Sequence, residues 1–426
     1  MSSRKPAVAF IFVTLVIDIL GIGLIIPILP NLVASFVENH DVSKASTVYG
    51  LLAALYSLMQ FLFAPILGSL SDHYGRRPVL LVSLLGAGLD YFLLAYAPSL
   101  SWFFVGRIIA GITGANIATA SAYIADVTPP EKRAAAFGLI GAAFGIGFVA
   151  GPALGGVLGD VGLRVPFLVA GGLAMLNWVY GLIILPESLP KANRRAFSWR
   201  RANPIGSLAA LRRHPVVLGL AGTHFLAYLG HQVLPSMWVL YTGYRYGWKP
   251  KQTGLSLAIV GIMAGVVQGG LTKIIVRRIG EQKALIFGLS VAALAYAAYG
   301  LATEGWMIYV ILVWASLGGV AGPAIQSLIT RNVEANEQGA VQGALTSLGS
   351  VAGIVGPIMA TALFAYFISQ RAPVHMPGVP FFFSAVLTVI GILLAVRSFR
   401  STSTSVPHSG GAAESTSPQP TPAEKL

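Results

Sequence analysis

The stretch "GSLSDHYGRRPVLL", residues 68–81, is a short charged turn between two long apolar runs. Gly75 can adopt the left-handed backbone conformation that a tight turn needs. Arg76 and Arg77 bring positive charge to the turn, and Asp72 is placed to accept hydrogen bonds from their guanidinium groups. The stretch therefore predicts two membrane helices joined by a turn that the arginines keep on the cytoplasmic side.

Further apolar runs of membrane-spanning length lie on both sides of this turn. The 426-residue chain is 55% hydrophobic and 10% charged, which excludes an ordinary water-soluble protein. A helix needs about 20 residues to cross the hydrocarbon core. We therefore expect an all-α integral membrane protein with twelve transmembrane helices, at residues 7–29, 49–70, 78–97, 101–124, 134–158, 165–185, 216–242, 252–276, 284–302, 306–329, 340–368 and 380–396.

The formal charge of +13 follows this topology. With the N-terminus in the cytoplasm, 21 Lys and Arg residues fall on the cytoplasmic side and 6 on the other, while Arg107 lies within a span. Both termini are then cytoplasmic. The sequence has no basic soluble domain that would bind nucleic acid, so we expect none as a partner.

The two halves of the chain repeat at a constant offset of 205 residues, which pairs Gly75 with Gly280, Gly114 with Gly319, Gly138 with Gly343, and Gly151-Pro152 with Gly356-Pro357. This repeat predicts two six-helix bundles, residues 1–185 and 215–397. The basic segment between them, residues 186–214, is predicted to be a cytoplasmic linker, either solvated or lying along the membrane surface. The Ser/Thr/Pro-rich tail, residues 398–426, is predicted to be disordered.

Four further strings accompany the charged turn: "LGIGLIIPILP" (residues 20–30), "SLLGAGLDYFLLAY" (83–96), "GRIIAGITGA" (106–115) and "GFVAGPALGG" (147–156). Together they resemble the major facilitator superfamily, and most of the chain is similar to its tetracycline/proton antiporter branch. The resemblance implies two pseudo-symmetric six-helix bundles that transport a solute by alternating access.

The resemblance also assigns roles to two groups of residues. It implies an inner gate made of Gly68, Asp72, Gly75, Arg76, Arg77 and Asp126. It implies an antiporter helix-packing motif made of Gly147, Gly151, Pro152, Gly155 and Gly156. The glycines at every fourth position allow another helix to approach closely, and the proline loosens the backbone hydrogen bonding. A static packing seam and a contact between moving halves both fit this pattern; the resemblance favours the moving contact.

Charged residues inside the membrane are costly and mark functional sites. Asp18 and Asp90 lie near the midplane of the first and third spans, and Arg107 lies in the fourth, so Asp90 is the best partner for Arg107. We expect all three to couple transport to protons. Asp18 has no cation in its own span and should take up a proton more readily than Asp90. A purely structural role is the alternative for either acid.

Polar side chains within apolar spans indicate a mostly apolar pocket for a bulky amphipathic ligand. The candidate substrate-binding residues are Gln60, Asn116, His231, Gln232, Gln268 and Gln326. Gln60, Gln232 and Gln268 match glutamines of the tetracycline branch. For each residue, hydrogen bonding between helices is the alternative.

His224, Tyr228 and His231 are spaced i, i+4, i+7 and share one face of the seventh span. A proton relay and ordinary packing both fit this spacing. Two histidines without a nearby acid make a poor ligand set, so we expect no metal. We expect no cofactor either.

The chain departs from the tetracycline branch, which usually has an acid in the ninth helix and a histidine in the eighth. Residues 284–302 contain no acid, and Ala264 stands at the histidine position. We therefore expect a proton-coupled antiporter of a bacterial inner membrane that exports tetracycline-like or other amphipathic drug-like compounds as a monomer. A proton/solute symporter of the same fold is the alternative. An enzyme is less favoured, because no nucleophile or cofactor motif is visible.

Overall fold

The structure is a computed structural model that describes residues 4–114, 116–129, 133–194, 215–333 and 338–403. The helices of the first half are α1 (Arg4–Ile25), α2 (Leu29–Ala34), α3 (Val42–Tyr74), α4 (Arg76–Ala95), α5 (Ser101–Thr113), α6 (Asn116–Val127), α7 (Arg133–Val161) and α8 (Val165–Ile184). Those of the second half are α9 (Pro215–His231), α10 (Val233–Tyr246), α11 (Pro250–Val266), α12 (Thr272–Ile279), α13 (Glu281–Leu301), α14 (Gly305–Ala315), α15 (Ala321–Arg331), α16 (Gln338–Ile368) and α17 (Val379–Ser403).

Among the described residues, ten continuous helical segments are long and apolar enough to cross a membrane. The fourth and seventh predicted spans are each divided into two shorter helices, α5 with α6 and α9 with α10. The chain therefore crosses the bilayer twelve times, as predicted. Two other spans contain irregular turns, the π-helical segment Val267–Leu271 and the 3₁₀ segment Ser316–Val320. Such irregular backbone is tolerated in a membrane where protein surrounds it or where it lines a cavity.

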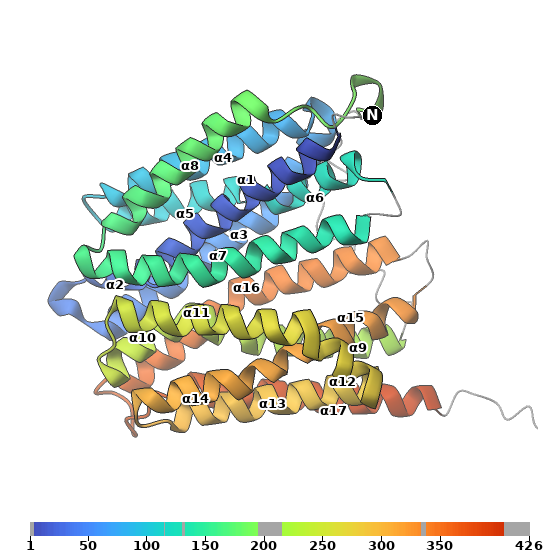
Figure 1. Cartoon of the computed structure of the whole chain (residues 1–426). Coiled ribbons are helices and arrows are strands. Elements are labelled where there is room, and N and C mark those ends of the chain that lie inside the picture. The colour runs from blue at the N-terminus through green and yellow to red at the C-terminus, as the bar shows by residue number, and fades with distance from the viewer. Residues whose placement is uncertain (1–3, 115, 130–132, 195–214, 334–337, 404–426) are drawn as a thin grey trace, which may run out of the picture.

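The helices form two groups. Figure 1 shows α1 to α8 in the upper half of the molecule and α9 to α17 in the lower half. The buried residues of each apolar cluster come from a single half. Across the boundary, α3 packs against α16 and α7 packs against α11. These two helix pairs therefore form the principal described contacts between the halves.

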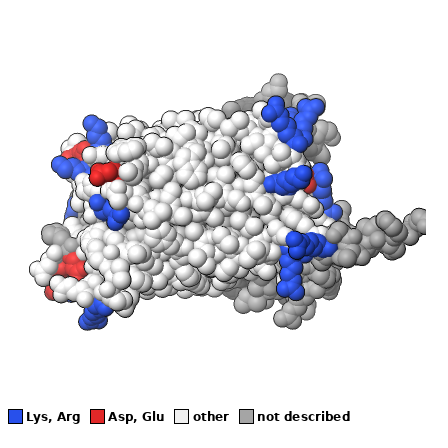
Figure 2. All heavy atoms as spheres, turned by 90° about the horizontal axis from the view of Figure 1, so that it is seen from below, with Lys and Arg blue, Asp and Glu red and all other residues white. Residues whose placement is uncertain are grey.

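Charged side chains concentrate at the two ends of the molecule, with an uncharged band between them (Figure 2). We name the end that carries Arg76, Arg77, Arg277 and Arg278 the basic end. Both ends of the described chain lie at this end (Figure 1). The helix α17 continues past residue 397 to Ser403, so the prediction of disorder is wrong for residues 398–403. The Ser398 hydroxyl donates to the Leu394 carbonyl (2.9 Å), in the turn that precedes this extension. Residues 404–426 lie outside the described structure.

The predicted turn at Gly75 is present, and its repeat has the same backbone conformation. Gly75 has φ 108° and ψ 161°, and Gly280 has φ 80° and ψ 162°. Each glycine ends one helix and begins the next. A positive φ is costly for residues with a Cβ, so glycine at both positions follows from the geometry of the turn.

Candidate functional site

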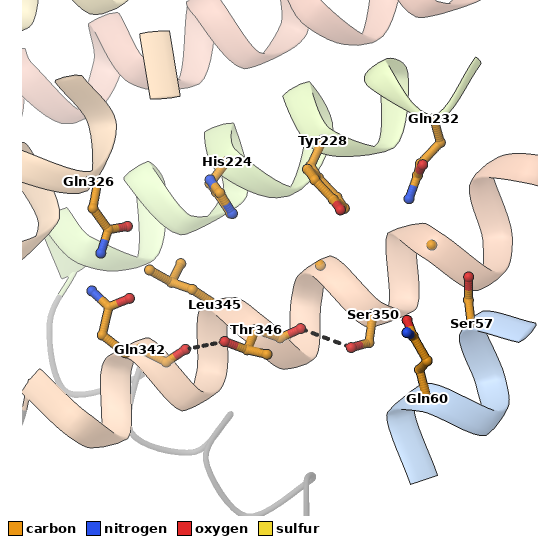
Figure 3. A pocket seen from close by; sticks show the side chains of 12 residues that line it. Ser57, Gln60, His224, Tyr228, Gln232, Gln326, Gln342, Leu345, Thr346 and Ser350 are labelled. Atoms are coloured by element: carbon orange, nitrogen blue, oxygen red, sulfur yellow. Dashed lines mark hydrogen bonds between the residues drawn. The ribbon is translucent and has the colours of Figure 1, made fainter. Parts of the chain in front are cut away.

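A cavity of about 400 Å³ lies between the two halves (Figure 3). Side chains of α9 point across it toward α16, and α3 closes one end. The lining residues are Ser57, Gln60, His224, Tyr228, Gln232, Gln326, Gln342, Leu345, Thr346, Gly349, Ser350 and Gly353.

The lining combines amides and hydroxyls with an aromatic surface. The rings of His224 and Tyr228 stack almost in parallel, with centroids 6.2 Å apart and an interplanar angle of 13°. None of the described lining residues is an aspartate, glutamate, lysine or arginine. Such a cavity suits a planar amphipathic compound that offers several hydrogen-bonding groups.

Three of the six predicted substrate-binding residues, Gln60, Gln232 and Gln326, line the cavity. Gln268 does not; it is exposed, within the π-helical segment. His231 also lies outside the lining and contacts the second half's α13, with its Nδ1 3.4 Å from the Tyr296 hydroxyl. His224 and Tyr228 therefore line the cavity, whereas His231, on the same helix, does not. The side chain of Asn116 lies outside the described structure.

Three lining residues on α16 were missed by the sequence analysis: Gln342, Thr346 and Ser350. They recur at every fourth position and form one polar stripe on a long apolar helix. The Thr346 hydroxyl donates to the Gln342 carbonyl (3.0 Å) and the Ser350 hydroxyl to the Thr346 carbonyl (3.1 Å). Their spacing was the available signal, because serine and threonine satisfy themselves in this way and are unremarkable one at a time.

The predicted pair of Asp90 and Arg107 is present. Arg107 Nη2 lies 3.6 Å from Asp90 Oδ2, and the side chains are only 10% and 1% exposed. Within the described structure, Asp90 Oδ1 and Arg107 Nε have no hydrogen-bond partner. Gly106 makes room for the carboxylate, because a Cβ there would lie 2.7 Å from Asp90 Oδ1. The pair is therefore buried but incompletely hydrogen-bonded.

A short series of contacts connects this pair to the cavity. The Arg107 guanidinium lies over the Tyr56 ring, 5.7 Å from its centroid. Gln60 Nε2 donates to the Tyr56 hydroxyl (2.8 Å), and Gln60 itself lines the cavity. Tyr56 was not predicted, although it stands one helical turn before Gln60. Two side chains, Arg107 and Tyr56, thus connect Asp90 to the cavity-lining Gln60.

Asp18, the other predicted membrane acid, lies on α1. It is half-buried, and it acts electrostatically on Tyr56 and Tyr91, as Asp90 does. The second half has no counterpart of the buried pair, because the repeat places Ala295 and Leu312 at the positions of Asp90 and Arg107. The described membrane carboxylates therefore belong to the first half.

The predicted inner-gate residues surround Arg76 at the basic end. Arg76 Nη1 lies 2.6 Å from Asp72 Oδ1, and its Nε lies 3.2 Å from Asp126 Oδ2. The Arg76 amide donates to Glu187 Oε1 (2.9 Å), a contact from the linker that the sequence analysis missed. Arg77 donates to the Leu182 carbonyl (2.8 Å). None of these contacts reaches the second half, and all except the one with the linker residue Glu187 lie within the first half.

Gly68 joins this network through its backbone, since the Ser71 hydroxyl donates to the Gly68 carbonyl (2.8 Å) and accepts from Arg76 Nη1 (2.6 Å). A Cβ at Gly68 would meet no atom within 4 Å, so the packing around this position does not itself require a glycine. Its place is near the last turns of α3, before the helix reaches Asp72.

The predicted packing motif meets two different helices. Gly147, Gly151 and Gly155 face α1; a Cβ at Gly151 would lie 2.7 Å from the Cα of Gly23. Gly156 faces α11 across the boundary, where its Cβ would lie 2.6 Å from the Pro250 carbonyl oxygen. The carbonyl of Pro152 also faces α11, beside Gly254. The regular glycine stripe is thus a seam within the first half, and the contact between halves belongs to Gly156 and Pro152.

The halves meet at the end opposite to the basic end and separate toward the basic end. The Ser43 hydroxyl of α3 donates to the Ala365 carbonyl of α16 (2.9 Å). On α7 and α11, Gly156 and Gly254 are in contact, whereas a Cβ at Gly145 or Gly265, nearer the basic end, would meet no atom within 4 Å. The halves are therefore in contact at the end opposite to the basic end, and α7 and α11 separate toward the basic end.

Comparisons with known proteins agree with this architecture. The chain is 44% identical over 359 residues to the class C tetracycline resistance protein of Escherichia coli, covering 84% of this chain and 90% of that protein. It is 40% identical over 352 residues to the class G tetracycline resistance protein of Vibrio anguillarum, covering 82% and 88%. The crystal structure of the human organic anion transporter MFSD10 (TETRAN) superposes with a TM-score of 0.68 at 25% identity, covering 93% of this chain and all of that one. Residues 11–357 match the Major Facilitator Superfamily, and this multi-pass membrane protein belongs to that family.

Proposed function

We propose that the protein is a proton-coupled efflux antiporter that exports tetracycline-like or other amphipathic drug-like compounds by alternating access. The single observation that carries this proposal is the buried Asp90–Arg107 pair, connected through Tyr56 and Gln60 to a cavity between the halves. The similarity to tetracycline resistance proteins supports the substrate class. Transport, not an enzymatic reaction, is the activity that this arrangement serves.

The coupling step in this proposal is a proton on a membrane carboxylate. A proton on Asp90 removes the charge that holds Arg107, and Arg107 then moves relative to the Tyr56 ring. The Tyr56–Gln60 hydrogen bond transmits this movement to the cavity. Asp18 takes up a proton from the outside and releases it inside as the halves rock. A neutral carboxyl group also lowers the cost of closing a dry cavity around it.

The same proposal sets the orientation in a bacterial inner membrane. The excess of Lys and Arg places the basic end, and with it both termini, in the cytoplasm. The structure then corresponds to a state open to the cytoplasm. Residues 1–185 and 215–397 move as two bundles joined by the linker at 186–214, and the Arg76 network steadies the α3–α4 turn as the cytoplasmic ends approach. A single chain suffices for this cycle.

The cavity supports a substrate range wider than metal-chelated tetracycline. Its described lining contains amides, hydroxyls and aromatic rings but no carboxylate to bind a cationic metal chelate. The acid and histidine of the tetracycline branch are absent from the ninth and eighth spans. Neutral and singly charged amphipathic compounds should therefore be transported as well.

The test is uptake into proteoliposomes with an imposed pH gradient. An antiporter concentrates tetracycline, or an unrelated amphipathic compound, in vesicles that are acidic inside, and a protonophore abolishes this accumulation. Accumulation in vesicles that are alkaline inside would instead establish proton symport. Accumulation that is indifferent to the gradient would refute proton coupling.

A further inference from the structure

The charged turns of the two halves are equivalent in position but opposite in charge. The 205-residue repeat places Arg277 at the position of Asp72, Glu281 at that of Arg76, and Arg331 at that of Asp126. All three signs are therefore reversed. Gly75 and Gly280 have the same backbone conformation, so the two turns are equivalent in backbone although their charges are reversed.

The second-half pair is formed in the structure. Arg331 Nη2 lies 3.0 Å from Glu281 Oε1, and the Ser327 hydroxyl donates to the same oxygen (2.7 Å). In the first half, the Ser71 hydroxyl accepts from Arg76 Nη1 at 2.6 Å. Each half thus joins a helix that begins at the turn to a helix that ends beside it, with a serine supporting the charge at the turn. Glu281 is well covered, with 14% of its side chain exposed.

Helix dipoles explain the charges of only one half. Glu281 is the first residue of α13 and Arg331 the last of α15, so both charges complement the helix ends. Arg76 is the first residue of α4 and Asp126 lies in the last turn of α6, so both oppose them. The feature common to the two halves is therefore the link between helix ends, and not a favourable charge at each end.

We propose that Glu281 and Arg331 form a second positioning pair for the transport cycle, the charge-reversed counterpart of Arg76 and Asp126. The pair holds the α12–α13 turn against the end of α15. This end is adjacent to the cavity wall, because Gln326 of α15 lines the cavity and Ser327 contacts Glu281. The pair therefore positions Gln326 when the second half moves. This inference rests on the proposed transport function.

A double-mutant cycle separates positioning from the stability of the helix ends. The variants are Glu281→Arg, Arg331→Glu and the double swap, each reconstituted as the full chain and assayed for tetracycline exchange. We expect each single change to slow exchange and raise its KM, so that the ratio of exchange rate to KM falls by about three-fold to ten-fold. An effect of this size is usual for the coupling between residues in contact. We expect the double swap to restore exchange to within about two-fold, because it copies the polarity that already works in the first half.

If the charges matter only through the helix dipoles, the double swap places both charges at the wrong helix ends. Exchange no faster than that of the slower single variant would therefore overturn the proposal. The control is Glu304→Arg with Arg371→Glu, which alters two exposed charges at the end opposite to the basic end. This control should exchange at the parent rate.

A second measurement needs no transported substrate. The chain contains no cysteine, and Gly265 has room for one. Maleimide labelling of Gly265→Cys therefore reports how often the basic end is open. Adding Glu281→Gln should change the labelling rate by about two-fold or more with an unchanged unfolding temperature; an unchanged rate would overturn the proposal. If the parent chain does not exchange tetracycline, the proposed function fails, while the labelling still decides the role of the pair.

Discussion

Neutralising one member of the Asp90–Arg107 pair should destabilise the protein far more than neutralising both. Removing one partner of a buried ion pair leaves an uncompensated charge and typically costs about 3–5 kcal/mol. The Nη2–Oδ2 separation of 3.6 Å and the unpartnered Oδ1 and Nε atoms indicate a weakly optimised pair. We therefore expect Asp90→Asn to cost about 3 kcal/mol. Arg107→Gln should cost about 1 kcal/mol more, because it also loses the contact with the Tyr56 ring.

The double variant Asp90→Asn/Arg107→Gln should recover at least half of the larger single loss, since neither charge remains buried alone. The assay is reversible unfolding in detergent micelles of fixed composition, with proton-driven uptake measured in parallel. All three variants should lose proton-driven uptake. Stability losses that simply add, within about 0.5 kcal/mol, would show that the two side chains do not interact and would refute this account of the pair.

Three further predictions concern the halves, the cavity and the second acid. Gly156→Val should push α7 and α11 apart and increase labelling of cysteines placed at the end opposite to the basic end, whereas Gly141→Val, with no atom within 4 Å of its Cβ, should not. Gln342→Ala should raise the KM for substrate by about three-fold, the loss of one hydrogen bond, while Gln268→Ala outside the cavity leaves it unchanged; equal effects would contradict the assigned lining. Asp18→Asn should abolish proton-driven uptake but retain part of the substrate exchange at zero gradient, and full accumulation by this variant would reduce Asp18 to a packing residue.

The sequence predicted those features that depend on strong local constraints. A glycine in a short charged stretch between two apolar runs predicts two helices joined by a tight turn. In the structure, Gly75 and Gly280 both have the positive φ of such a turn. A buried arginine needs an anion, and the nearest membrane carboxylate on the neighbouring span is its partner. A charged side chain buried in the membrane has few possible partners, and a tight turn has few possible residues, so these features could be predicted from the sequence.

The face that each polar residue presents could not be predicted as well. The sequence singled out Gln268 and His231 because they are polar residues in apolar spans, but neither lines the cavity, and helical periodicity alone does not identify which face of a span meets the other half. Glycine spacing identified a close helix contact but not its partner, and the stripe at Gly147, Gly151 and Gly155 meets α1 of the same half. Such outcomes depend on tertiary packing, which sequence periodicity does not contain.

The most direct test of proton-coupled export is the sign of the proton movement that a substrate gradient drives. Proteoliposomes containing trapped pyranine, with equal pH on both sides and no membrane potential, receive an inward gradient of tetracycline. The account predicts that substrate entry makes the vesicle interior more alkaline, as protons leave in exchange, and that Asp90→Asn abolishes this change. An interior that becomes acidic through the protein, or a pH that stays constant while substrate enters, would contradict it.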